Sequence, residues 1–87
     1  MHTQQITIDI PESILLTEKM DKNSFAREIR ILAAVKLFEL GRLTSGSAAE
    51  LAGMSRIEFL DSLRNYGVFP LLSELTDLEA ENAKSDQ

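Results

Sequence analysis

The stretch from Leu43 to Leu60 reads LTSGSAAELAGMSRIEFL and predicts two short helices joined by a tight turn. Three alanines leave the first helix with almost no side-chain bulk, so that a second helix can cross it closely; they are Ala48, Ala49 and Ala52. Gly53 follows them and supplies the positive φ that ends a helix at a position where a Cβ is costly. We therefore expect a sharp corner at Gly53.

The second helix of this pair has its own start signal. Ser55 predicts the N-cap, and Glu58, three residues later, is the partner residue of a capping box. A small-residue helix, a glycine, one apolar residue and then a capped helix carrying Phe59 is the order found in DNA-binding helix-turn-helix motifs. In that motif Ala49 lies where the two helices touch. The last buried position of the second helix falls on Ser62, where an aliphatic residue is usual.

An αα-hairpin that packs without binding DNA is the alternative for this stretch. Such a hairpin uses the same glycine and serine signals. Leu63 fills only part of the space that an aliphatic side chain at position 62 would occupy. A generic αα-hairpin does not require the full pattern Ala-Ala-x-x-Ala-Gly-x-Ser. The pattern therefore favours the DNA-binding geometry.

The size and composition of the chain limit the other possibilities. Its 87 residues include no cysteine and one histidine, His2, which predicts one small domain without disulfides or thiolate metal sites. A domain of this size is marginally stable alone, so we expect a homodimer. No signal peptide or membrane-length apolar run is present, and we expect a soluble, cytoplasmic protein. No nucleophile–base pair, metal-ligand cluster or phosphate-binding glycine loop is visible, so we expect neither an enzyme nor a cofactor or metal site.

The net charge of −5 is unevenly distributed. Residues 41–66 carry three basic and three acidic side chains, whereas residues 67–87 carry one basic and five acidic side chains. A neutral helix-turn-helix predicts weak non-specific affinity for DNA, because neutralisation of phosphates supplies most of that affinity.

The N-terminal segment alternates apolar and polar residues. Residues 5–11 read QITIDIP, with Ile6, Ile8 and Ile10 on one face and Pro11 as the stop, and so predict a short β-strand. A strand needs a partner. The candidates are residues 68–72 of the same chain, where Pro70 weakens the pairing, or the strand of a second copy. In either case we expect the three isoleucines in the core.

A strand followed by helices is also the order of ribbon-helix-helix repressors, whose paired strands contact DNA. The outward residues of this strand are Gln5, Thr7 and Asp9, which include no lysine or arginine. Asp9 facing phosphate is unfavourable, so this alternative ranks below the helix-turn-helix.

A long helix is expected between the strand and the corner. Ser24 predicts its N-cap, the helix runs over residues 25–40, and Gly41 ends it. Its second half is apolar nearly all round, which predicts burial on several sides, one of them against a second subunit. A short helical turn over residues 11–16 precedes it, and residues 17–23 read as a loop.

The candidate DNA-binding residues lie in and beside the helix-turn-helix, which we place at residues 44–65. Arg56 and Arg64, near the two ends of the second helix, are suited to a phosphate or a guanine edge. Arg42 lies before the motif as a third candidate for phosphate. The apolar residues of the second helix cannot all face inward, so Ile57 or Leu60 must face solvent, DNA or another chain. Of the two, Ile57 is included among the candidate DNA-binding residues.

The C-terminal segment combines an apolar stripe with acidic residues. Leu71, Leu75 and Leu78 follow helical spacing, which predicts either a helix that docks on the body or a segment that orders on a protein partner. The candidate partner-binding residues are Leu71, Glu74, Leu75, Asp77 and Leu78, with Glu74 and Asp77 placed opposite a basic or metal-containing site. We expect the domain to cover residues 1–78, followed by an acidic disordered tail at residues 79–87.

Several of these segments resemble a known family. LFELGRLT (37–44) running into AAELAGMSR (48–56), followed by EFL (58–60) and GV (67–68), is similar to an uncharacterised family of small prokaryotic proteins. That family is regarded as antitoxin-like helix-turn-helix proteins, often encoded beside a PIN-domain ribonuclease toxin. The resemblance covers most of the chain, up to about Leu72.

The resemblance implies a DNA-binding antitoxin, in which the motif binds an operator and the C-terminal segment blocks the toxin. It places Ser55 and Arg56 at the start of the recognition helix, which adds Ser55 to the candidate DNA-binding residues. Ser47 stands where the family often has a lysine, so one phosphate contact is lost.

Together these observations predict a mainly α fold, with a small helix-turn-helix domain, a short N-terminal β-strand and an intertwined homodimer. The predicted function is that of an antitoxin and transcriptional regulator with operator DNA and a PIN-domain-like toxin as partners. The alternative is a protein-interaction or dimerisation module that does not bind DNA.

Overall fold

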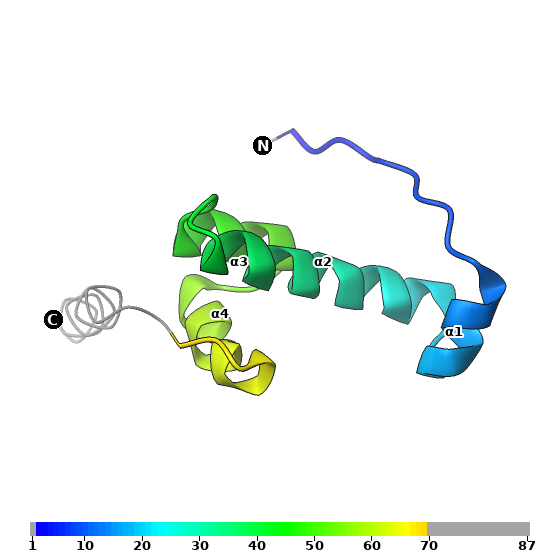
Figure 1. The fold of residues 1–87 in the computed structure, drawn as a ribbon. Coiled ribbons are helices and arrows are strands. Elements are labelled where there is room, and N and C mark those ends of the chain that lie inside the picture. The colour runs from blue at the N-terminus through cyan, green and yellow to red at the C-terminus, as the bar shows by residue number, and fades with distance from the viewer. Residues whose placement is uncertain (1, 70–87) are drawn as a thin grey trace, which may run out of the picture.

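A computed structural model of the chain describes residues 2–69, and these residues are mainly helical. In chain order the elements are α1 (Glu12–Glu18), α2 (Lys22–Glu39), α3 (Ser45–Ala52), α4 (Arg56–Ser62) and the 3₁₀ turn η1 (Leu63–Tyr66). Figure 1 shows α2 as the long axis of this part of the chain, with α3 and α4 beside its C-terminal half and α1 at its other end. The predicted mainly α fold is confirmed.

The core lies where the C-terminal half of α2 meets α3 and α4. Alanines from α2 and α3 surround larger side chains from α4, so that the helices approach closely and the core is still filled. Phe38 of α2 and Phe59 of α4 meet edge to face, with ring centroids 5.6 Å apart, a favoured aromatic geometry. The buried apolar residues are Ala34, Val35, Ala48, Ala49, Ala52, Phe59, Leu60, Leu63 and Val68.

Helix α2 begins one turn earlier than the sequence predicts. Its N-cap is Asp21, whose carboxylate accepts a hydrogen bond from the backbone N–H of Ser24 at 2.7 Å. The predicted cap at Ser24 is therefore wrong, because Ser24 is the residue that Asp21 caps. This backbone hydrogen bond, with a second one from the Ser24 side chain, holds the pKa of Asp21 below its usual range.

The connection between α1 and α2 is also shorter than predicted. The sequence predicts a loop over residues 17–23, but α1 extends to Glu18 and α2 starts at Lys22. Lys19 ends α1 in the left-handed conformation, with φ of 57°, and its N–H donates to the carbonyls of Leu15 and Leu16. A tight C-terminal cap replaces the expected loop.

The N-terminal segment is extended but unpaired. Residues 2–10 form no strand within the part of the chain that the structure describes, and Ile6 and Ile8 are 81% and 57% exposed. Within residues 2–69 of a single chain these isoleucines do not lie in the core, so this prediction is wrong. Of the candidate partner at residues 68–72, only Val68 and Phe69 are described; Val68 lies in the helical core, and its N–H donates to the carbonyl of Leu63.

Burial of α2 is confined to its C-terminal half. Ala34 and Val35 are its buried residues, whereas Leu32 is 47% exposed, and Leu40, directly after the helix, is 57% exposed. The predicted burial on several sides is thus only partly present in one chain. No helix within residues 2–69 is long and apolar enough to cross a membrane.

Candidate functional site

The corner between α3 and α4 is built from short-range hydrogen bonds. Thr44 caps α3 by accepting a hydrogen bond from the N–H of Ser47 at 3.2 Å. At the other end Gly53 has a φ of 74°, and the N–H of Met54 donates to the carbonyl of Ala49 at 2.9 Å. A Cβ on Gly53 would meet no atom within 4 Å. The glycine is therefore required by its backbone conformation and not by crowding.

The start of α4 carries the predicted capping box. The hydroxyl of Ser55 accepts from the N–H of Glu58, and the carboxylate of Glu58 accepts from the N–H of Ser55, both at 3.1 Å. The backbone hydrogen bond from Ser55, followed by one from its side chain, lowers the pKa of Glu58. This part of the sequence prediction is confirmed.

Replacement of Ser55 by alanine is expected to lower the free energy of unfolding by about 1 kcal/mol, the usual cost of losing an N-cap hydroxyl. Urea titration followed by circular dichroism measures this change. Ser47→Ala is the control, because Ser47 is an exposed serine whose side chain caps no helix. Equal stabilities of the two variants would contradict the expectation.

The capping box also predicts a pH dependence. Because the folded-state pKa of Glu58 is lowered, its stabilising effect is present above the pKa of the unfolded chain and is lost as the pH falls through the folded pKa. Glu58→Gln should therefore show a shallower loss of stability on acidification than the unmodified chain. Asp21 keeps its own acid dependence in both proteins, so the difference between them isolates Glu58.

The apolar side chains of α4 and of the turn that follows it differ in burial. The helix gives way after Ser62 to η1, and Leu63 becomes fully buried. Leu63 thus fills the core beside Ser62, the position where the helix-turn-helix pattern predicts a missing aliphatic side chain. The hydroxyl of Ser62 donates a hydrogen bond to the carbonyl of Phe59 at 2.8 Å. Leu60 is buried and Ile57 is 47% exposed, so Ile57 is the apolar residue that faces outward.

Arg56 lies closer to the protein than the sequence indicates. Its Nε donates to the hydroxyl of Ser45 at 2.8 Å, and Ser45 itself is buried. The hydrogen bond joins the start of α4 to the start of α3. Arg56 therefore helps to hold the corner together, a function that sequence reasoning missed.

A second arginine was missed altogether. Nε of Arg30 donates to the carbonyl of Leu51 at 2.9 Å and so joins α2 to the last turn of α3. The last carbonyls of a helix lack partners within the helix, and a cationic donor is favourable there. No local pattern in the sequence marks Arg30, because its acceptor is 21 residues away.

The candidate DNA-binding residues fall in three segments of the described chain. Ser55, Arg56 and Ile57 are consecutive at the start of α4, whereas Arg42 lies in the connection before α3 and Arg64 lies in η1. Arg42 and Arg64 are exposed, and neither forms an ion pair or hydrogen bond with its side chain to another residue between 2 and 69. The candidate partner-binding residues Leu71, Glu74, Leu75, Asp77 and Leu78 lie outside the described residues.

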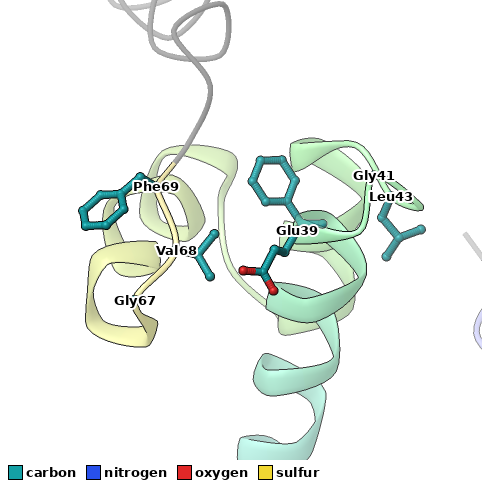
Figure 2. A pocket seen from close by; sticks show the side chains of 7 residues that line it. Glu39, Gly41, Leu43, Gly67, Val68 and Phe69 are labelled. Atoms are coloured by element: carbon teal, nitrogen blue, oxygen red, sulfur yellow. The ribbon is translucent and has the colours of Figure 1, made fainter.

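A hollow of about 470 Å³ lies at the C-terminal end of α2. Figure 2 shows the side chains of Glu39 and Val68 pointing toward each other across it, and the ring of Phe69 turned away. The Glu39 carboxylate is paired with Lys36 at 2.9 Å. The remaining lining residues are Phe38, Gly41, Leu43 and Gly67. Glu39 is the charged residue of this lining, which is otherwise apolar or glycine.

Between residues 2 and 69 no group of three potential metal-ligating side chains comes together.

The fold and the corner define a small helical protein in which two short helices cross at a glycine turn beside one long helix. The chain belongs to the uncharacterised protein family UPF0175, whose model matches residues 1–87. A UPF0175 protein from Aeropyrum pernix is 29% identical over 66 residues, which cover 76% of this chain and 70% of the relative. No solved structure matches the chain.

Proposed function

We propose that this protein is a DNA-binding antitoxin and transcriptional regulator, which binds a two-fold operator as a homodimer and a PIN-domain-like toxin through its C-terminal segment. The observation that carries the DNA-binding part is the α3–α4 corner. It consists of a helix, a glycine turn and a capped second helix, which is the order expected for a helix-turn-helix, and Ile57 is exposed on the second helix. The family resemblance carries the toxin-binding part.

Three separate devices hold α4 in a fixed orientation. Phe59 and Leu63 anchor it in the core, the capping box fixes its first turn, and the hydrogen bond from Arg56 to Ser45 ties it to α3. A recognition helix must be held rigidly, because base contacts depend on sub-ångström placement. The exposed side chain of Ile57 is then suited to an apolar contact with a thymine methyl group.

The charges of the corner support modest affinity. Arg42 and Arg64 are the two arginines of this region that we expect to reach phosphates, so a dimer supplies four. Each neutralised phosphate contributes about −0.9 to the slope of log K against log salt, which predicts a slope of about −4 or shallower. Binding of this kind depends more on base contacts than on charge.

A titration of the full chain against the DNA upstream of its own gene, at low and moderate salt, tests DNA binding. The double substitution Arg42→Gln and Arg64→Gln should weaken binding and make the salt slope shallower by about 4 in the dimer. The charge-matched control is Lys22→Gln with Arg27→Gln, at the other end of α2, which should leave the slope unchanged. If wild-type binding is absent, or if both double variants lose the same slope, the proposed surface is wrong.

Inhibition of a toxin has a separate test. Co-expression with a PIN-domain nuclease encoded beside the gene should restore growth, and Leu75→Asp with Leu78→Asp in the full chain should abolish that rescue. The same variant should still bind DNA, because neither leucine belongs to the α3–α4 corner. The antitoxin assignment fails if no nuclease-like gene lies next to this one, or if the unmodified chain does not restore growth.

A protein-interaction module that does not touch DNA is the second candidate. It is favoured by the neutral charge of residues 41–66 and by the exposed apolar side chain of Ile57. An affinity without any salt slope, or no affinity at all, in the DNA titration would select this alternative.

A further inference from the structure

The N-terminal part of the chain has no core of its own. Residues 2–33 contain no buried side chain, although they include the extended segment, all of α1 and the first part of α2. Figure 1 shows the extended segment running away from α1 and the N-terminal end of α2 projecting beyond α3 and α4. Helix α1 has seven residues, fewer than an isolated helix needs to be stable in water. Stable folding of this part therefore requires a cover from outside residues 2–69.

The exposed side chains of this part are large and apolar. Five of them show exposed fractions between 42% and 81%, and they lie on the extended segment, α1 and α2: Ile6, Ile8, Ile14, Leu16 and Leu32. Within residues 2–69, the N–H and C=O groups of residues 3–9 have no backbone hydrogen-bond partner. An extended segment with free backbone groups and one isoleucine face is a template for pairing with another strand.

We propose that Gln5–Asp9 of two copies of this chain pair as antiparallel β-strands about a two-fold axis at Thr7. The isoleucine face of the resulting ribbon packs on α1 and the first part of α2 of both copies. A two-stranded ribbon is marginal alone and becomes stable when helices cover its apolar face. The inference gives the interface of the homodimer included in the proposed function, and it stands whether or not that dimer binds DNA.

The occupant is a second copy because the segment is complementary to itself. With the axis at Thr7, Ile6 lies opposite Ile8 of the second copy, and Asp9 lies opposite Gln5. Cross-strand apolar pairs are favourable, and like charges directly opposite each other are not. A parallel, in-register pair would place the two Asp9 carboxylates side by side.

The axis falls at Thr7 and not at Ile8 for two reasons. Ile10 is already half-buried in its own chain, whereas Ile6 and Ile8 are the exposed isoleucines that need a cover. An axis at Ile8 would also bring the two Asp9 side chains into diagonal contact on one face.

Sedimentation of the full chain at micromolar concentration tests the interface. The unmodified protein should be a dimer, and Ile6→Asp with Ile8→Asp should raise the dimer dissociation constant by about 100-fold or more, since two apolar contacts are replaced by charges. The control is Ile57→Asp, which also places an acidic residue at an exposed isoleucine but on α4, and which should remain dimeric. Circular dichroism should show that the body formed by α2, α3 and α4 is still helical in each variant.

Cysteine cross-linking tests the register of the strand pair. The sequence contains no cysteine, so any disulfide forms only between the introduced residues. Opposed residues of an antiparallel pair have Cα atoms about 4.5–5.5 Å apart, within the range of a disulfide. Thr7→Cys should therefore oxidise to a covalent dimer. Gln5→Cys and Asp9→Cys should each fail to link to their own copy, because about 14 Å would separate the equivalent residues, but an equimolar mixture of the two should form the mixed disulfide.

Three results would overturn the proposal. The first is a stable, folded monomer of the unmodified chain. The second is a dimer that survives the double aspartate substitution. The third is efficient cross-linking of Gln5→Cys or Asp9→Cys with its own copy, which would indicate a parallel pair or a different axis.

Discussion

Replacement of Phe59 by alanine is expected to destabilise the protein by about 3–5 kcal/mol, enough to unfold much of it in a domain of this size. Phe59 is fully buried and contacts Phe38 edge to face, so truncation leaves a large cavity at the centre of the α2–α3–α4 core. The adjoining alanines are too small to fill the cavity. Urea unfolding followed by circular dichroism at 222 nm measures the change.

The matched control for this substitution is Ile57→Ala on the same helix. Ile57 is 47% exposed, and we expect its truncation to cost well under half as much as that of Phe59. A Phe59→Ala variant within 1 kcal/mol of the unmodified protein would mean that the core described here does not hold α4 in place.

Replacement of Ala48 by leucine is expected to have the second-largest effect, a destabilisation of about 1–3 kcal/mol or more from overpacking. Ala48 is fully buried in the core that α3 shares with α2 and α4. A leucine there must push the helices apart. Thermal unfolding of the variant measures the loss.

Ser47→Leu is the control for overpacking, because Ser47 is the preceding residue of α3 and is exposed. Its substitution should change the stability by no more than about 0.5 kcal/mol. Equal losses for the two leucine variants would show that a leucine is poorly tolerated anywhere in α3, and would contradict the close approach of the helices at Ala48.

The corner was predictable from the sequence because its determinants are local. Gly53 ends α3, and Ser55 and Glu58 cap each other, through hydrogen bonds that join residues no more than five positions apart. Such bonds form with the same partners whatever the rest of the chain does. Helical geometry likewise predicted that either Ile57 or Leu60 of α4 faces outward.

The cap of α2 shows where local reasoning becomes ambiguous. Asp21 and Ser24 are both good N-cap residues and stand three positions apart, so that each is compatible with a helix start. The structure selects Asp21, whose side chain accepts the N–H of Ser24. The sequence alone does not rank these two alternatives.

By itself, then, the sequence determined the helical class, the glycine turn at Gly53 and the capping box, since these depend on backbone conformation and on hydrogen bonds within one or two turns. Only the tertiary structure decided that Leu63 fills the core beside Ser62 and that Arg56 and Arg30 bind acceptors 11 and 21 residues away. It also decided that Ile6 and Ile8 lie exposed in the single chain. The physical reason is that a side chain's partner across a core, or a strand's partner across a sheet, depends on the packing of distant segments, which no local pattern specifies.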